Sequence, residues 1–252
     1  MLSQEALTIH VRYPFKYLQS VKSTNDIARE WLEQGAETLS TVISDEQRAG
    51  RGRRGRVWYT PPEVALALSV VLKPTLNVAP RVTMLGALAV YDLCQSLQID
   101  GVGIKWPNDV QIHGKKVSGV LAEAAWRDGQ LLGVILGVGV NVRNQLSEEL
   151  APIATTLANE TTQQLDRAQL VGLLVDRIAH WHTQIATNAL LTTWRTRLTT
   201  LGLSVVVEGV NRRIVGQAVA TDQDGALLIK TTDGSIQRIL AGDVSLRTQH
   251  KD

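Results

Sequence analysis

The sequence contains one cysteine, and this scarcity limits the chemistry open to the protein. Cys94 alone cannot form an intramolecular disulfide or a zinc site built from cysteines. It stands among apolar residues in YDLCQSL, which favours a packed core thiol over a nucleophile.

Long apolar runs are also missing. No stretch approaches about 18 uninterrupted apolar residues, the length typical of a membrane-spanning helix. The N-terminal segment MLSQEALTIHVRYPF has no basic region followed by an apolar core, so it does not resemble a secretory signal. We therefore expect a cytoplasmic protein that does not contact a membrane.

The chain has no dominant charge of either sign, since its formal net charge is +2. Five arginines nevertheless stand within residues 48–56, so the remainder of the chain is mildly acidic. Positive charge gathered in one place favours local capture of an anion over tracking along a phosphate backbone.

The apolar patterns predict a body of mixed helices and strands over residues 1–201. Ser23 and Asp26 have the spacing of a capping box at the start of a helix that ends near Gly35. Further helices are expected over 81–97, 168–185 and 189–198. Strands are expected over 10–18, 38–44 and 64–74, and three or four more between 102 and 142.

The pattern changes after Gly202. Five short strand-like segments follow, over 203–209, 212–220, 226–231, 235–240 and 244–248, separated by turns such as DQDG and TDG. They predict a small antiparallel barrel over residues 202–252, packed against the body without a long linker.

The segment AGRGRRGRVW (49–58) matches G-x-G-x-x-G, the fingerprint of dinucleotide-binding folds. That fingerprint requires a helix beginning at its third glycine, whereas Gly55 is followed by RVWYTPPE, whose two prolines exclude a helix interior. A merely solvated loop needs neither three glycines nor the five mutually repelling arginines of residues 48–56. The segment therefore favours an anion-binding loop that is mobile when empty and ordered by its ligand.

Three other clusters are individually weak. Residues 104–110 (IKWPNDV) offer Lys105 and the hard oxygens of Asn108 and Asp109, which suit Mg²⁺ but also fit an ordinary strand and turn. Residues 114–123 (GKKVSGVLAE) read equally well as a surface hairpin carrying Lys116. The alternate glycines of LGVGVNV (136–142) are explained by a tightly packed buried strand alone.

Together and in this order, these segments resemble the motifs of biotin protein ligases across roughly residues 20 to 145. The matching segments are Ser23-Thr24-Asn25, Glu46-Gln47, GRGRRGR at 50–56, Lys105-Trp106-Pro107-Asn108-Asp109, GKKVSG at 114–119 and GVGVN at 137–141. The resemblance implies an α+β fold of the class II aminoacyl-tRNA synthetase type. A central mixed or antiparallel sheet is flanked by helices, and a small SH3-like β-barrel follows.

The resemblance also implies a two-step reaction. Biotin and MgATP form biotinyl-5′-AMP and pyrophosphate, and biotin then passes to one lysine of a biotin carboxyl carrier domain, typically of acetyl-CoA carboxylase. Because biotin's carboxylate is already ionised, the first step needs no strong base. Its obstacle is the approach of two anions, which an arginine loop and Mg²⁺ relieve by positioning and charge neutralisation. No tightly bound cofactor is expected.

Roles for individual residues follow from the resemblance. The biotin-binding set is Ser23, Thr24, Asn25, Gln47, Arg51, Gly52, Arg53, Lys116 and Gly119. The ATP-binding set is Arg53, Arg54, Arg56, Trp58, Lys105, Asn108 and Asn141, with Trp58 stacked on adenine. The metal set is Asp109 and Asn108. The catalytic set is Lys116, Arg51 and Asp109, in which Asp109 is our hypothesis for the group that takes the acceptor lysine's proton.

Some relatives in this family carry an N-terminal helix-turn-helix that represses transcription. About 20 residues precede Ser23, too few for such a domain, so we expect a ligase-only protein that does not bind DNA. The carrier protein and the oligomeric state stay open: a homodimer through sheet edges or the AAWRDGQLLGVIL hairpin is one possibility, and burial within a monomer explains that hairpin equally well.

Two rival functions are weighed against this interpretation. A lipoate or octanoyl protein ligase, related in fold and chemistry, needs a long apolar tunnel and does not require Gln47 or the full GRGRRGR. An RNA-binding protein could use the arginine loop and the barrel. Against it stand the nearly neutral chain and the lack of an exposed aromatic series in the C-terminal strands.

Overall fold

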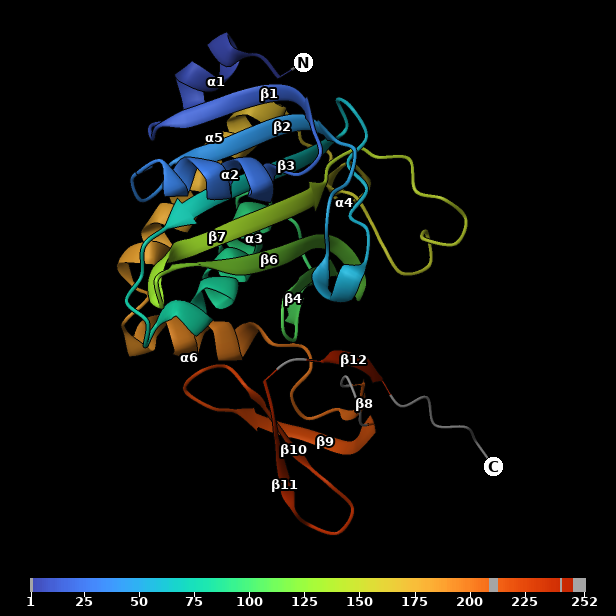
Figure 1. The fold of residues 1–252 in the computed structure, drawn as a ribbon. Coiled ribbons are helices and arrows are strands. Elements are labelled where there is room, and N and C mark those ends of the chain that lie inside the picture. Colours follow the sequence, from blue (N-terminus) through green and yellow to red (C-terminus); the bar gives the residue numbers. More distant parts are fainter. Residues whose placement is uncertain (1, 209–212, 241, 247–252) are drawn as a thin grey trace.

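The structure is a computed structural model that describes residues 2–208, 213–240 and 242–246. Its body is a seven-stranded mixed sheet in the order β1-β2-β3-β7-β6-β5-β4, in which β1 and β2 are parallel and all other neighbours antiparallel (Figure 1). The strands are β1 (Phe15–Val21), β2 (Thr41–Gln47), β3 (Ala65–Leu72), β4 (Val102–Lys105), β5 (Asp109–Ile112), β6 (Lys115–Arg127) and β7 (Gln130–Asn141).

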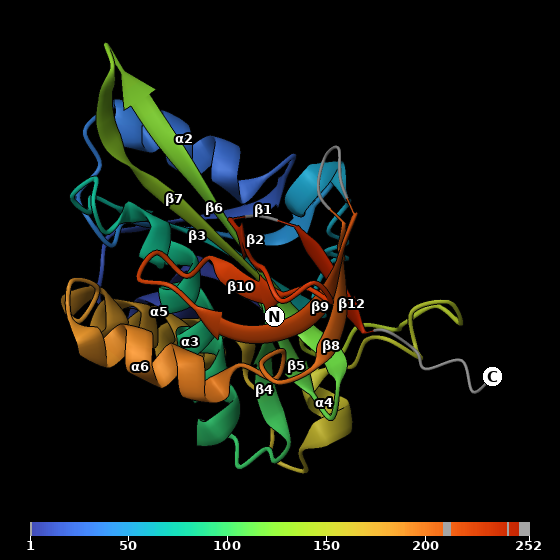
Figure 2. The ribbon, with the colours of Figure 1, turned by 90° about the horizontal axis from the view of Figure 1, so that it is seen from below.

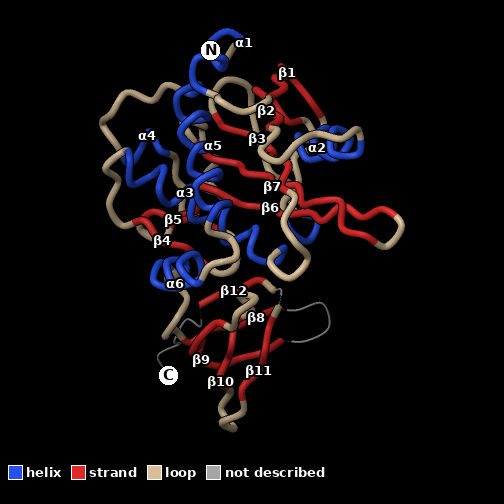
Figure 3. The backbone as a smooth tube through the Cα atoms, turned by 90° about the vertical axis from the view of Figure 1, so that its left-hand side faces the viewer, coloured by secondary structure: helices blue, strands red, loops and turns tan. Residues whose placement is uncertain are grey.

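Helices cover the two faces of this sheet unequally (Figure 3). Helix α2 (Thr24–Glu33) packs on β2, β3 and β7 from one side, burying Ala28 and Leu32. Helices α3 (Val82–Ser96) and α5 (Arg167–Thr183) pack on each other and on the other face. Helix α3 is apolar on almost every side, as expected of a helix buried between a sheet and a second helix.

The remaining helical elements are short or peripheral. They are α1 (Gln4–His10), α4 (Leu157–Glu160), α6 (Asn188–Arg197) and the 3₁₀ turns η1 (Arg53–Gly55) and η2 (Ala79–Arg81). No helix of the described ranges has both the length and the apolar character needed to cross a bilayer. Cys94 is fully buried and burial raises the pKa of its thiol to about 12, so the prediction of a core thiol is confirmed.

The second sheet contains five antiparallel strands in the order β11-β10-β9-β8-β12, and it is strongly curved (Figure 2). The strands are β8 (Ser204–Glu208), β9 (Arg213–Thr221), β10 (Leu227–Lys230), β11 (Ile236–Ile239) and β12 (Asp243–Leu246). The predicted strand residues at 209, 212, 247 and 248 lie outside the described part of the chain. The predicted fold class, a helix-flanked mixed sheet followed by a small SH3-like barrel, is confirmed.

The barrel contacts the body through the turn at residues 222–226. The indole Nε1 of Trp106 donates to the carbonyl oxygen of Gly225 at 2.8 Å, and both groups are buried. Arg195 of α6 donates to the carbonyl oxygens of Thr221 and Asp222, each at 2.8 Å. The Trp106 bond joins the barrel to the segment that leads into Asn108 and Asp109, and the Arg195 bonds join it to α6.

Two predicted boundaries were wrong. The N-terminal strand begins at Phe15 rather than residue 10, because residues 4–10 form α1, whose N-cap Ser3 accepts from the backbone N–H of Ala6. The second strand covers 41–47 rather than 38–44. Leu39, which the prediction placed in a strand, has a left-handed φ of 71°.

Candidate active site

A cavity of about 240 Å³ opens on the α2 face of the sheet, at the ends of β2, β6 and β7. All but two of the predicted site residues line it. Those that do are Ser23, Thr24, Asn25, Gln47, Arg51, Gly52, Arg53, Arg56, Trp58, Asn108, Asp109, Lys116, Gly119 and Asn141. The structure thus brings residues from six separate sequence segments together around one space.

One end of the cavity is formed by uncharged polar groups. The backbone N–H and the hydroxyl of Thr24 both donate to Gln47 Oε1, at 2.9 and 3.0 Å. Ser69 Oγ of β3 lies 2.7 Å from Thr24 Oγ1 and 2.6 Å from Asn25 Oδ1. Thr24, Asn25 and Ser69 are each at least 95% buried, so this end is held rigidly by its own hydrogen bonds.

Ser23 stands at the N-cap position of α2, but its side chain forms no capping hydrogen bond. Asp26, expected to complete a capping box with it, instead receives two hydrogen bonds from Arg51. The capping-box prediction was therefore wrong. The Ser23 side chain is left to line the cavity.

Glycines on β6 and β7 make room for two side chains of the cavity wall. A Cβ atom added to Gly137 would lie 2.3 Å from Asn25 Oδ1, and one added to Gly139 would lie 2.2 Å from the indole nitrogen of Trp58. Gly119 is paired with Gly139 across the two strands, and its added Cβ would also contact the indole at 3.2 Å. The alternate glycines therefore leave space against the sheet for the side chains of Asn25 and Trp58. Packing of the strands alone does not require this space.

The arginine-rich segment folds back on itself as an irregular hairpin. The N–H of Trp58 donates to the Gly50 carbonyl at 2.9 Å, and the N–H of Gly52 donates to the Arg56 carbonyl at 2.7 Å. Its tip is η1, in which Arg54 and Gly55 both have left-handed φ angles, 58° and 76°. Gly50 admits no side chain, because a Cβ there would lie 2.4 Å from the Trp58 carbonyl oxygen.

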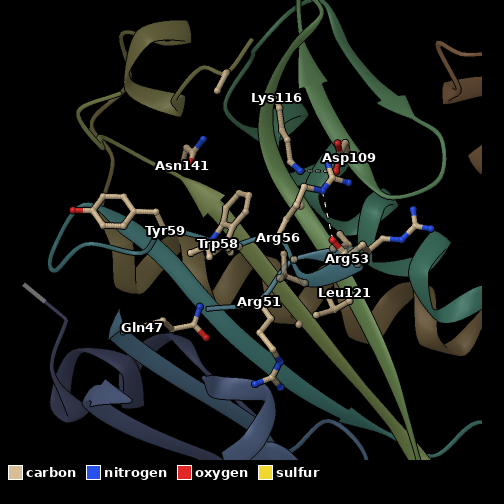
Figure 4. A pocket seen from close by; sticks show the side chains of 18 of the residues that line it. Gln47, Arg51, Arg53, Arg56, Trp58, Tyr59, Asp109, Lys116, Leu121 and Asn141 are labelled. Atoms are coloured by element: carbon tan, nitrogen blue, oxygen red, sulfur yellow. Dashed lines mark hydrogen bonds and ion pairs between the residues drawn. The ribbon is translucent and has the colours of Figure 1, made fainter. Parts of the chain in front are cut away.

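Arg51 is paired with carboxylates in this structure. Its guanidinium donates to both oxygens of Asp26, at 2.6 and 2.9 Å, and lies 3.4 Å from Glu123 Oε2. The hydrogen bonds from Arg51 lower the pKa of the Asp26 carboxyl. Figure 4 shows the Arg51 side chain extending away from Lys116 and Asp109.

The opposite end of the cavity carries charged groups. Lys116 Nζ lies 2.7 Å from Asp109 Oδ1 and 5.5 Å from the centre of the Trp58 ring (Figure 4). Arg53 donates to Asn108 Oδ1 at 3.1 Å, and Asn108 donates to the Val120 carbonyl at 2.7 Å. Lys116 and Asp109 stay partly exposed, at 29% and 20%.

The oxygen ligands at this end of the cavity suit only a weakly bound cation. Asn108 and Asp109 supply an amide oxygen and one carboxylate, and the described residues contain no cluster of three or more His, Cys, Asp or Glu side chains that could hold a metal. Mg²⁺ typically keeps several waters and binds one or two carboxylates together with substrate phosphates. The two residues therefore fit a Mg²⁺ that arrives with a nucleotide.

Asn141 closes the cavity from the end of β7. Its Nδ2 donates to the Thr155 carbonyl at 3.1 Å, and its Oδ1 accepts from Asn144 at 2.9 Å. Arg54 and Lys105 are not among the lining residues. Arg54 donates to the Glu208 carbonyl of the barrel at 2.7 Å, and Lys105 is the last residue of β4, paired with Asp109.

Sequence reasoning missed Ser69, Asp26 and Glu123. One sequence feature could have indicated Ser69: it is the single hydroxyl residue inside the otherwise apolar strand ALALSVVL. Asp26 adjoins a predicted motif and Glu123 ends the segment 114–123. Nothing in the sequence indicates that both contact Arg51, which is 25 residues from one and 72 from the other.

Comparisons with known proteins identify relatives of the whole chain. Residues 17–141 match the biotin/lipoate A/B protein ligase family, and residues 200–247 match the biotin protein ligase C-terminal domain. A biotin--[acetyl-CoA-carboxylase] ligase of Paracoccus denitrificans is 31% identical over 228 residues, which cover 86% of this chain and 94% of that protein. The bifunctional ligase/repressor BirA of Bacillus subtilis is 32% identical over 243 residues, which cover 91% of this chain and 73% of that protein.

The fold comparison gives the same result. The solved structure of biotin protein ligase from Aquifex aeolicus in complex with biotin and ATP superposes with a TM-score of 0.78 and 30% identity, covering 93% of this chain and 98% of that one. Sequence and architecture therefore agree, and the chain belongs to the biotin protein ligase family.

Proposed function

We propose that this enzyme activates biotin with MgATP to biotinyl-5′-AMP and then transfers the biotinyl group to a lysine of a biotin carboxyl carrier domain of acetyl-CoA carboxylase. One observation carries the proposal. A single cavity joins uncharged donors and acceptors at one end to Lys116, Arg53 and Arg56 at the other. Biotin has a neutral ureido head and an anionic tail, and the two ends match it in that order.

In the first step a carboxylate oxygen of biotin attacks the α-phosphorus of ATP, and pyrophosphate leaves with the broken α–β bond. Thr24, Asn25 and Gln47 bind the head, while Lys116 and Arg53 offset the repulsion between the carboxylate and the triphosphate. Trp58 presents a ring against which adenine stacks. Arg54 and Lys105 retain their proposed nucleotide roles only if they turn toward the cavity when ATP binds.

Mg²⁺ belongs to this step as part of the substrate MgATP. Asn108 and Asp109 would hold it, and it would neutralise phosphate charge. In the structure the same oxygens contact Arg53 and Lys116. We therefore expect MgATP to exchange these cation–oxygen contacts for metal–oxygen contacts.

In the second step the acceptor lysine's amine attacks the acyl carbon of the mixed anhydride, AMP leaves, and the amine loses a proton. Asp109 is our proposed acceptor of that proton. We expect the Asp109→Asn variant to transfer biotin slowly from preformed biotinyl-5′-AMP in a rapid-quench experiment. Normal transfer combined with slow adenylation would limit Asp109 to metal and nucleotide binding.

The nearest alternative is lipoate attachment, since the larger family match covers both biotin and lipoate ligases. The match of residues 200–247 to a domain named for biotin protein ligases favours biotin. Stabilisation of the protein against heat by biotin but not by lipoate would support our proposal, and the reverse would overturn it. Gel shifts with RNA and no biotin-dependent ATP–pyrophosphate exchange would favour the RNA-binding alternative.

The proposal includes further expectations about the protein as a whole. They are the division into domains at 201/202, a cytoplasmic location and the absence of DNA binding; the oligomeric state stays open between a monomer and a homodimer. The central assay is biotin-dependent exchange of labelled pyrophosphate into ATP by the wild type and by Arg51→Ala and Lys116→Ala. Biotin-independent or absent exchange in the wild type would overturn the proposal.

A further inference from the structure

A second cavity, of about 140 Å³, lies where the barrel meets the body. Arg53, Val120 and Leu121 line both this cavity and the active-site cavity, so the two adjoin. Arg53 also donates to Asn108 Oδ1 at 3.1 Å, next to Asp109. The second cavity, which we call the junction cavity, therefore adjoins the charged end of the active site.

The body and the barrel contribute different side chains to the wall of the junction cavity. The apolar side chains from the body are those of Pro80, Met84, Pro107 and Trp194. The barrel contributes Asp224 and Leu240, which are half or more exposed, at 51% for the Asp224 side chain and 67% for Leu240. Trp194, by contrast, is buried. The junction cavity thus opens to solvent at the barrel residues and leads inward to Arg53.

The turn that carries Asp224 is held firmly against the body. The carbonyl oxygen of the adjacent Gly225 accepts from the Trp106 indole at 2.8 Å, and Gly225 has no room for a side chain next to α3. Within the barrel, a guanidinium nitrogen of Arg238 lies 2.9 Å from Asp224 Oδ2, and Arg238 also pairs with Asp222. Two carboxylates and one guanidinium leave a net charge of −1 at the opening.

We propose that the junction cavity is the passage through which the acceptor lysine of the carrier domain reaches the acyl carbon of biotinyl-5′-AMP. This inference rests on the proposed function. The negative charge at Asp224 attracts the lysine's ammonium group. The apolar part of the wall suits the methylene stem of a lysine, which readily lies along apolar surface. The barrel thereby takes part in recognising the acceptor lysine.

Arg53 stands at the inner end of this passage and favours the reactive form of the lysine. A neighbouring cation lowers the pKa of a lysine amine from its ordinary value of about 10.4, so the ammonium releases one proton to solvent there. The neutral nitrogen then attacks the acyl carbon, a C–N bond forms, and the bond to the AMP oxygen breaks with its electron pair. The nitrogen's second proton passes to Asp109, its proposed acceptor.

Charge variants at Asp224 test the passage in the second step alone. Transfer of biotin from preformed biotinyl-5′-AMP is measured at increasing concentrations of the carrier domain. We expect Asp224→Asn to raise the half-saturating carrier concentration about 2- to 5-fold, and Asp224→Lys about 10-fold, with the maximal rate unchanged. Added salt should raise this concentration in the wild type and have less effect in Asp224→Asn, because salt screens the same attraction. Asp233→Asn, at an exposed carboxylate of another barrel turn, is the matched control and should equal the wild type.

A blocking variant tests the same passage sterically. Thr83 of α3 lines the junction cavity, which Thr83→Trp fills and Thr83→Ala leaves open. We expect Thr83→Trp to slow transfer by at least about tenfold and Thr83→Ala to leave it unchanged. Biotin-dependent ATP–pyrophosphate exchange, which involves no lysine, should persist in both.

The two steps separate the possible outcomes. Normal transfer by both Asp224→Lys and Thr83→Trp would overturn the inference. An equal loss of exchange and transfer in these variants would also overturn it, since the junction cavity would then serve adenylation or stability. A wild type without biotin-dependent exchange would instead overturn the proposed function.

Discussion

The two ends of the cavity differ in how their side chains are held. At the polar end Thr24, Asn25 and Ser69 are buried and bonded to one another. At the charged end Lys116 and Asp109 are partly exposed and form a pair that a ligand can replace. The polar end is therefore preformed, whereas the charged end must exchange partners when an anion enters.

This difference separates binding from catalysis. A rigid neutral end selects a ligand by matched donors and acceptors, because every mismatch leaves a buried group unpaired. The side chains of a partly exposed charged end can exchange one anionic partner for another as a reaction proceeds. Variants at the two ends should therefore change different binding and kinetic constants.

The largest effect is expected at the charged end. Lys116→Met keeps the apolar stem but removes the ammonium group and leaves Asp109 uncompensated beside the triphosphate. We expect biotin-dependent ATP–pyrophosphate exchange to fall by about 10²- to 10³-fold, the usual cost of losing one charge-stabilising donor. Lys115→Met is the matched control, since the neighbouring Lys115 is exposed, and it should stay near the wild-type rate.

The next effect compares two glycines of the same strand. An alanine at Gly137 collides with Asn25 at the polar end, and an alanine at Gly139 collides with Trp58. Overpacking of this kind costs about 1–3 kcal/mol. Steady-state kinetics should therefore give Gly137→Ala a raised KM for biotin and Gly139→Ala a raised KM for ATP. Identical changes in both variants would contradict a division of the cavity into two ends.

A smaller change is expected for Ser69→Ala at the polar end. It leaves Asn25 Oδ1 without its partner, and an unsatisfied buried acceptor costs about 1–3 kcal/mol. We expect calorimetry to show weaker biotin binding and an unchanged affinity for α,β-methylene-ATP alone. An equal loss for both ligands would indicate a general distortion of the sheet.

The smallest effect concerns Asp26 and pH. Arg51 lowers the pKa of Asp26, so the pair stabilises the folded state above the ordinary carboxyl pKa of about 3.9 and loses that stabilisation as the pH falls through the lower folded value. Because Asp26 is 45% exposed, the pair contributes about 0.2–1 kcal/mol. Urea unfolding of wild type and Asp26→Asn should differ by that amount at about pH 6, and the difference should shrink at about pH 3. A difference that grows toward acid would contradict this sign.

Much of the site could be predicted because its chemistry lies in short segments. The motif around Arg51, the segment ending at Asp109 and the strand ending at Asn141 each carry their residue types at a recognisable spacing. The helices and strands followed from apolar periodicity, and most of their boundaries fell close to those of the structure. Helix α1 escaped prediction because its seven residues bury only Leu7.

Contacts between distant segments could not be predicted. The bond from Asn25 to Glu123 joins residues 98 apart, and that between Ser69 and Asn25 joins residues 44 apart. Such pairs depend on how α2 lies across β3, β7 and β6. The alternate glycines of β7 likewise have a packing explanation in the sequence and acquire their role only where Asn25 and Trp58 meet them.

The sequence by itself determined the family, the order of elements and the residue types available for the chemistry, because local patterns and motif spacing carry that information. The tertiary structure decided which of these residues share a cavity, how its two ends differ, and that Arg51 and Asn25 meet at one carboxylate. The physical reason is that hydrogen bonds, ion pairs and steric exclusion act over a few ångströms in space, whatever the separation along the chain.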